Sequence, residues 1–133
     1  MGFFGRNRWE FSVEKLLNRE ISVQEFVNAN EKKTLFYSTP FYENEKGQFP
    51  NAMQTQGSDC FYFPAFTTLA GLEEHLKIIG CAEHLVIKGD LKSVLDSLDS
   101  HRLIQSWGVV IDPHSIPSVG IPPRVRVQPK CLR

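Results

Sequence analysis

The residues from 60 to 111 alternate between two apolar patterns, and this alternation constrains the fold more than any other feature of the sequence. Short continuous apolar runs, typical of buried strands, occur at 60–63, 85–87 and 109–111. Between them, apolar residues recur every three or four positions, as on one face of a helix. The two predicted apolar faces are Leu69, Leu72, Leu76 and Ile79, and then Leu91, Val94, Leu95 and Leu98.

Residues with strong capping preferences mark the ends of these two predicted helices. Thr67 or Thr68 precedes the first helix and Asp90 precedes the second, and their side chains can accept hydrogen bonds from N–H groups of the first turn. Gly80 follows the first helix, where glycine readily takes the left-handed conformation. Strands connected through helices favour parallel pairing, so the segment is predicted to run strand, helix, strand, helix, strand in one sheet.

A run of three strands is predicted before the first of these helices. Pro40 stops the first strand, and Pro64 limits the aromatic third one. Short turns join antiparallel neighbours, so we expect an antiparallel meander. The whole chain is therefore predicted to be α+β, with a mixed sheet of about five strands and helices packed on it. The strands of the meander are 35–39, 51–56 and 60–63, with polar turns at 43–47 and 56–59.

Short helices are predicted at the N-terminus and an extended segment at the C-terminus. Ser12 is expected to cap a first short helix, and Ser22 with Glu25 fits a capping box for a second helix that ends near Asn30. Prolines interrupt the C-terminal residues, although 124–127 alternate and are expected to add an edge strand. The predicted organisation is a helical lead-in at 1–33, an α+β domain at 34–115 and a proline-rich extended tail at 116–133.

The charge balance argues against several classes of partner. Lys plus Arg and Asp plus Glu number 15 each, so the formal net charge at pH 7 is zero. Nucleic-acid binding needs a basic face, and we expect neither that partner nor a membrane, since no apolar run reaches the length of a span. The first residues do not form a signal-peptide pattern. Zero net charge also removes one barrier to self-association, which is compatible with a homodimer.

The cysteines and histidines offer two candidate chemistries. Three cysteines without close spacing do not form a disulfide framework, and they favour a reducing cytoplasm. Cys81 and His84 have a zinc-like spacing, but the second ligand pair of a structural zinc site is missing, so a loop is expected. Cys60 precedes an aromatic strand, where a buried and inert thiol is the usual outcome. The aromatic residues around Pro64 lack interleaved basic residues, which favours core packing over RNA stacking.

Three segments carry a further pattern, namely LFYSTP at 35–40, FYFPAFTT at 61–68 and WGVVIDP at 107–113. In this order they resemble the N-terminal domain of the SseB family, the enhanced-serine-sensitivity proteins of bacteria. The family commonly has Asn before the final proline where this chain has Asp112, and both residues suit a turn. Longer members carry a second, C-terminal domain, in whose place this chain has its proline-rich tail. The resemblance implies a regulatory or binding module without established catalytic residues, and by analogy a toxin-neutralising immunity protein.

Two functional hypotheses follow. The first is a non-enzymatic module, with no cofactor or metal, that binds another protein. The second is a small enzyme or ligand-binding protein that brings Cys60, Asp112 and His114 together at strand ends, where ligands often bind in open sheets. The partner surface of the first hypothesis is predicted near Tyr37, Tyr42, Tyr62, Asp112 and His114.

Overall fold

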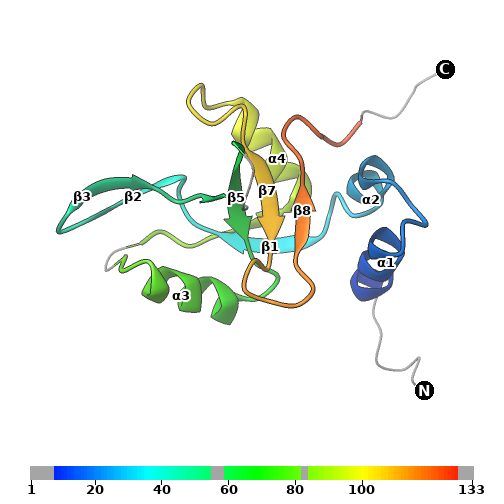
Figure 1. Ribbon diagram of the computed structural model, residues 1–133, viewed down its shortest axis with the longest axis horizontal. Coiled ribbons are helices and arrows are strands. Elements are labelled where there is room, and N and C mark those ends of the chain that lie inside the picture. The colour runs from blue at the N-terminus through cyan, green and yellow to red at the C-terminus, as the bar shows by residue number, and fades with distance from the viewer. Residues whose placement is uncertain (1–7, 55–58, 82–83, 129–133) are drawn as a thin grey trace.

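The computed structural model describes residues 8–54, 59–81 and 84–128, and within them the chain forms four helices and eight strands (Figure 1). The predicted α+β class is confirmed. The helices are α1 (Arg8–Leu17), α2 (Val23–Ala29), α3 (Leu69–Ile78) and α4 (Leu91–Asp99). The strands are β1 (Thr34–Tyr37), β2 (Phe41–Asn44), β3 (Gly47–Pro50), β4 (Met53–Gln54), β5 (Phe61–Ala65), β6 (Ile87–Asp90), β7 (Gly108–Ile111) and β8 (Val119–Ile121).

A four-stranded sheet in the order β4-β5-β7-β8 forms the centre of the molecule (Figure 1). Strands β5 and β7 are parallel, with Phe63 opposite Val109 and Ala65 opposite Ile111, as the strand–helix alternation predicts. The outer pairs β4–β5 and β7–β8 are antiparallel. Strand β5 continues through Pro64, which was expected to end it. Strand β4 pairs only with the first two residues of β5, so the missing N–H of Pro64 faces no strand on that side.

The predicted meander is confirmed for the antiparallel pairing of its second and third strands, now β4 and β5, but its first strand pairs elsewhere and the strands do not form one five-stranded sheet. Strand β1 pairs with β6 in an antiparallel ladder outside the central sheet, and it meets the end of β5 only through a bridge between Phe36 and Phe66. The buried run expected at 85–87 is shifted, because Leu85 and Val86 are exposed and the strand starts at Ile87. Local sequence patterns predict where these strands occur, whereas long-range contacts determine which strands pair.

The polar turn at 43–47 is confirmed as the tip of a β2–β3 hairpin. Gly47 adopts a φ of 129°, which a residue with a side chain rarely takes, and the Asn44 side chain accepts a hydrogen bond of 2.7 Å from the Lys46 N–H. Of the weak strand expected at 51–56, the structure describes 51–54, and only Met53–Gln54 form a strand, β4. Most of the turn expected at 56–59 lies outside the described residues.

Helices α4, α1 and α2 share one hydrophobic core with the central sheet. The predicted apolar face of α4 is confirmed, since all four of its residues are buried. Val13 of α1 and Phe26 and Val27 of α2 belong to the same core, and Figure 1 shows both helices beyond the β8 edge of the sheet. Helix α3 covers a smaller cluster around Leu72 and Leu76, while its first residue, Leu69, is exposed.

The predicted helix starts are confirmed for three helices and wrong for α1. Ser22 and Glu25 form both hydrogen bonds of a capping box, at 3.0 and 2.8 Å, and the helix stops at Asn30. Thr68 and Asp90 each accept a bond from an N–H of the first turn of their helices. Ser12 lies inside α1, because that helix begins four residues earlier at Arg8.

The C-terminal segment differs from the predicted tail. Residues 119–121 form β8 within the sheet, whereas the edge strand expected at 124–127 does not form. Instead, Arg126 in this segment forms hydrogen bonds with α2 and with the end of α4. Gln24 of α2 donates to the Arg126 carbonyl at 2.7 Å, and the Arg126 guanidinium holds the Asp99 carboxylate with two bonds of 3.0 Å. No helix in the described part of the chain is long and apolar enough to cross a membrane.

Candidate functional site

The sheet register separates Cys60 from Asp112 and His114. Cys60 precedes β5 and Asp112 follows β7, and these two strands are parallel neighbours, so the residues lie at opposite ends of the sheet. An offset of six residues corresponds to roughly 20 Å along a strand. The hypothesis that these three residues form one reactive site is therefore wrong.

His114 instead belongs to a chain of hydrogen bonds that reaches into the protein. Its Nε2 lies 2.9 Å from Nδ1 of His75 in α3, and Nε2 of His75 lies 3.1 Å from Oδ1 of Asn51. The Asn51 amide donates to the Thr39 carbonyl at 3.1 Å, which identifies Oδ1 as the acceptor for His75. A neutral His75 therefore donates from Nε2 and accepts at Nδ1 from His114. We call His75, His114 and Asn51 the His75 cluster.

Burial keeps His75 neutral. The side chain is 3% exposed, and its ring lies 5.3 Å from that of Phe66. Burial, and secondly the neighbouring His114, lower the pKa of His75 from 6.5 to about 4. At neutral pH both ring nitrogens are occupied by hydrogen bonds, so this histidine connects three segments of the fold and has no position open to a substrate.

Asp112 is engaged with Thr67 rather than with His114. Its two carboxylate oxygens accept bonds from the N–H and the hydroxyl of Thr67, at 2.9 and 2.8 Å. The Asp112 backbone has a φ of 54°, a left-handed conformation that Asp and Asn tolerate better than most residues. Asp112 and His114 are neighbours in one loop, but the Asp112 side chain bonds to Thr67, just before α3, and the His114 side chain bonds to His75 within α3.

The predicted partner surface is not one face of the molecule. Tyr37 is 6% exposed and packs edge-on against Phe63 in the core, and burial and then Asp90 raise its phenolic pKa. Tyr42 is half-buried in the β2–β3 hairpin, where its ring lies 5.9 Å from that of Phe49. Tyr62 alternates with Phe63 along β5 and so lies on the other face of the central sheet.

The zinc-like spacing of Cys81 and His84 does not mark a metal site among the described residues. Cys81 is buried, which raises the pKa of its thiol, and His84 is exposed. No group of three His, Cys, Asp or Glu side chains in the described ranges is placed to hold a metal ion. The segment between these two residues lies outside the described part of the chain.

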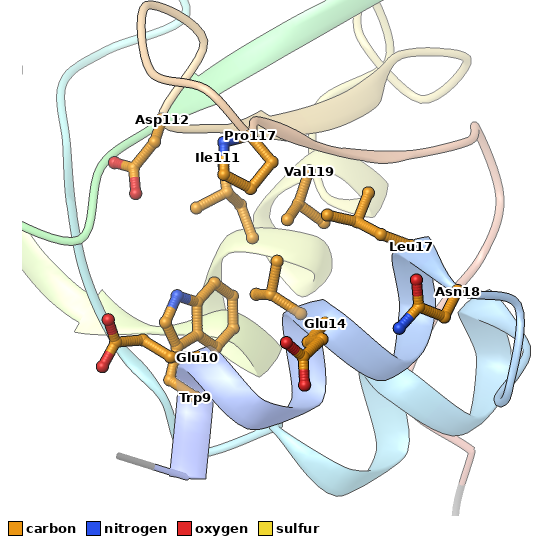
Figure 2. Close-up of a pocket in the computed structure, with 10 residues that line it drawn as sticks. Trp9, Glu10, Glu14, Leu17, Asn18, Ile111, Asp112, Pro117 and Val119 are labelled. Atoms are coloured by element: carbon orange, nitrogen blue, oxygen red, sulfur yellow. The ribbon is translucent and has the colours of Figure 1, made fainter. Parts of the chain in front are cut away.

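A pocket of about 370 Å³ between α1 and β8 is a site that the sequence analysis missed (Figure 2). Its buried floor consists of Val13, Ile111 and Val119. Trp9 and Leu17 line it from α1, on the same side of that helix as Val13. We call it the α1–β8 pocket. In Figure 2 the side chains of Trp9, Glu10 and Glu14 lie below it, Leu17 lies to the right beside Val119, and Asp112, Ile111 and Pro117 lie above.

The lining of the α1–β8 pocket is apolar inside and acidic outside. Pro117 of the β7–β8 loop completes the apolar part. Glu10 and Glu14, one helical turn apart on α1, and Asp112 across from them add three carboxylates, and none of the described residues that line the pocket is basic. Trp9, Val13 and Leu17 recur at intervals of four in the sequence. The prediction that the helix starts at Ser12 left Trp9 outside the helix, so the repeat was not recognised.

No protein-family model, curated protein or solved structure matches this chain. The resemblance to the SseB family therefore stays a prediction.

Proposed function

We propose that this chain is a non-enzymatic protein-binding module, and that the α1–β8 pocket receives a short extended segment of its partner. The observation that carries the proposal is the position of the pocket beside the outer edge of β8. Within the described residues β8 is the last strand of the central sheet and pairs only with β7. An extended peptide can add to such an edge through its backbone while a side chain enters an adjacent pocket.

The size of the edge sets the size of the occupant. Strand β8 has three residues, and Pro117 and Pro122 flank it closely, so an added strand would pair over roughly 10 Å. Val119 lies opposite Ile111 in the ladder, and both line the pocket. A residue placed opposite Val119 on an added strand would face the same way and enter the pocket.

The SseB resemblance implies a bacterial regulatory or toxin-neutralising role. Both are roles of a protein-binding module, the class of function proposed here. We place that role in the cytoplasm, which three cysteines without close spacing in the sequence favour. The closed His75 cluster supports binding over catalysis, because its polar atoms are used within the fold.

Selection of random peptides by display on phage tests this proposal. We expect enriched peptides to bind at micromolar concentration and to shift the backbone amide resonances of α1 and β8. Leu17 is 52% exposed at the pocket, so Leu17→Gln should weaken binding about tenfold without unfolding the protein. Ile78→Gln is the matched control, since Ile78 also ends a helix and is 62% exposed, but on α3.

The mode of binding is tested separately with the enriched peptides. Methylation of alternate backbone nitrogens removes the donors that a strand needs, and it should abolish binding if the peptide pairs with β8. Failure of repeated selections to enrich any peptide would overturn the proposal, as would equal binding to Leu17→Gln and the parent protein. A concentration-dependent dimer that Leu17→Gln dissociates would replace the foreign partner with a second copy of this chain.

A further inference from the structure

A second pocket, of about 250 Å³, lies between α4 and the end of β1. Tyr37 and Ile87, which face each other in the β1–β6 ladder, line it together with Phe63 of β5. Val94 and Leu98 line it from α4. We call it the α4–β1 pocket. The described residues that line it are all different from those of the α1–β8 pocket, so the two pockets are separate.

The α4–β1 pocket lies where β1 leaves the central sheet. Phe36 and Phe66 exchange two backbone hydrogen bonds, of 2.7 and 2.8 Å, in an isolated antiparallel bridge. In a continued ladder the next hydrogen-bonded pair would place Ser38 opposite Pro64, and proline has no N–H to donate. The ladder therefore stops at the bridge, and Ser38 and Thr39 line the pocket instead.

Ser38 brings a buried hydroxyl to this pocket. The residue is 4% exposed, and its side chain forms no hydrogen bond with another residue of the described chain. Every fully enclosed side-chain oxygen or nitrogen in the described ranges has a hydrogen-bond partner, so the Ser38 oxygen is reached from the pocket that it lines. A hydroxyl that is buried without a partner is unfavourable, which indicates that an occupant of the pocket supplies one.

The other hydroxyls that line the pocket are committed within the fold or lie away from it. Those of Thr39, Ser97 and Ser100 donate to backbone carbonyls at 2.8, 2.8 and 2.9 Å. The Tyr37 hydroxyl packs against Gly89, which is not a lining residue. Ser38 is therefore the polar group of the pocket that is best placed to recognise a ligand.

The size and lining of the pocket define the body of that ligand. A cavity of roughly 150 Å³ holds a benzene ring, so this pocket accommodates one ring with a small substituent. The rings of Tyr37 and Phe63 lie 6.0 Å apart in an edge-on arrangement, and a further ring packs well against such a pair. None of the described lining residues is Asp, Glu, Lys or Arg, so an ionised ligand would lose hydration without gaining an ion pair with such a side chain.

We propose that the α4–β1 pocket binds a small, uncharged aromatic molecule with one hydroxyl group, whose ring lies on Tyr37 and Phe63 and whose hydroxyl pairs with that of Ser38. A hydroxyl suits this position because each partner can donate or accept. The site is additional to the peptide site proposed above and does not depend on it.

Three compounds of one shape test the proposal, namely p-cresol, toluene and p-toluate. Each is titrated into the protein while the backbone amide resonances of residues 97–104 and of Ser38 are followed. We expect p-cresol to bind with a Kd of about 1 mM, as suits a ligand of its size, and the anion p-toluate not to bind. In Ser38→Ala, p-cresol should bind about fivefold more weakly, the worth of one neutral hydrogen bond, and toluene should bind as tightly as before.

The comparison of two ligands in two proteins isolates the hydroxyl pair, because the different hydration of p-cresol and toluene cancels. Ser38→Ala should leave the midpoint of urea denaturation unchanged, since the hydroxyl that it removes has no partner in the described chain. Ser106→Ala, at an exposed position, is the matched control and should change neither ligand. Ser97→Leu enlarges a lining residue of α4 with a better helix former, and it should abolish binding of both ligands.

The outcomes bear on different parts of the proposal. If Ser38→Ala weakens p-cresol no more than it weakens toluene, recognition by Ser38 is overturned. Equal binding of p-toluate and p-cresol would overturn the preference for an uncharged ligand. If neither p-cresol nor toluene shifts these resonances at about 10 mM, or if the shifts persist in Ser97→Leu, the α4–β1 pocket is not a binding site. Peptide selection by display reports on the α1–β8 pocket alone, so the two proposals stand or fall separately.

Discussion

The β7–β8 loop borders two regions that differ in how their polar groups are used. On the α3 side, His114 joins His75 and Asn51 in a chain of hydrogen bonds that ends at a backbone carbonyl. On the α1 side, Asp112 and Pro117 line a pocket between α1 and β8, the last strand of the central sheet among the described residues. One region is closed within the fold, and the other presents charge and apolar surface beside a strand edge.

This difference shows why neighbouring polar residues in a loop need not share a function. Asp112 and His114 were predicted to act together, either on a partner or on a ligand. Their side chains bond to different residues, Thr67 and His75, so each must be interpreted from what it contacts. A polar group with every position occupied stabilises the fold, whereas a carboxylate with unused acceptor positions at a pocket can still bind.

The largest expected effect tests the closed region. His75→Ala removes a buried ring and leaves Oδ1 of Asn51 without its donor, which should lower the free energy of unfolding by about 3 kcal/mol. Urea denaturation followed by the fluorescence of Trp9 and Trp107 measures it. His84→Ala, at an exposed position, should change stability by under about 0.5 kcal/mol. Equal effects of the two substitutions would show that the His75 cluster is not a stabilising element.

The second prediction concerns substitutions of Asp112, which lies in the loop between the two regions. Asp112→Ala removes both bonds from Thr67 and forces alanine into a left-handed backbone, which together should cost about 2.5 kcal/mol. Asp112→Asn tolerates that backbone and keeps an acceptor, so it should cost under about 1 kcal/mol. The same denaturation measurement compares them. A similar loss for both would mean that the carboxylate charge, and not the turn geometry, holds the loop.

The elements that the sequence predicts well are those specified by neighbouring residues. The capping box of Ser22 and Glu25, the caps Thr68 and Asp90 and the buried face of α4 all depend on contacts within a few positions. Strand pairing depends on residues far apart in the chain. The pairing of β1 with β6, rather than with its sequence neighbours, therefore could not be read from local patterns.

The two regions beside the β7–β8 loop were hidden for different reasons. His75 lies between Leu72 and Leu76 on the buried side of α3, and its position there was visible in the sequence, but its partner Asn51 comes from a distant segment. The α1–β8 pocket needs the first turn of α1, which the prediction omitted, and a strand inside a segment predicted to be an extended tail. Tertiary contacts assemble both regions.

The smallest of the three effects is a dependence of stability on pH that originates in the closed region. The pKa of His75 is about 4 in the folded protein against 6.5 for an unperturbed histidine. Between these values the unfolded chain binds a proton that the folded protein excludes, so the free energy of unfolding rises with pH up to about 6.5 and then levels off. Lowering the pH from 7 to 5 should therefore remove about 2 kcal/mol of stability. His75→Gln retains an amide donor for Asn51 but does not titrate, so its stability should change much less over this range. Urea denaturation at half-unit pH steps measures both proteins. If both show the same slope, the acid sensitivity comes from other groups, and the His75 cluster is not the closed network that distinguishes this side of the loop from the α1–β8 pocket.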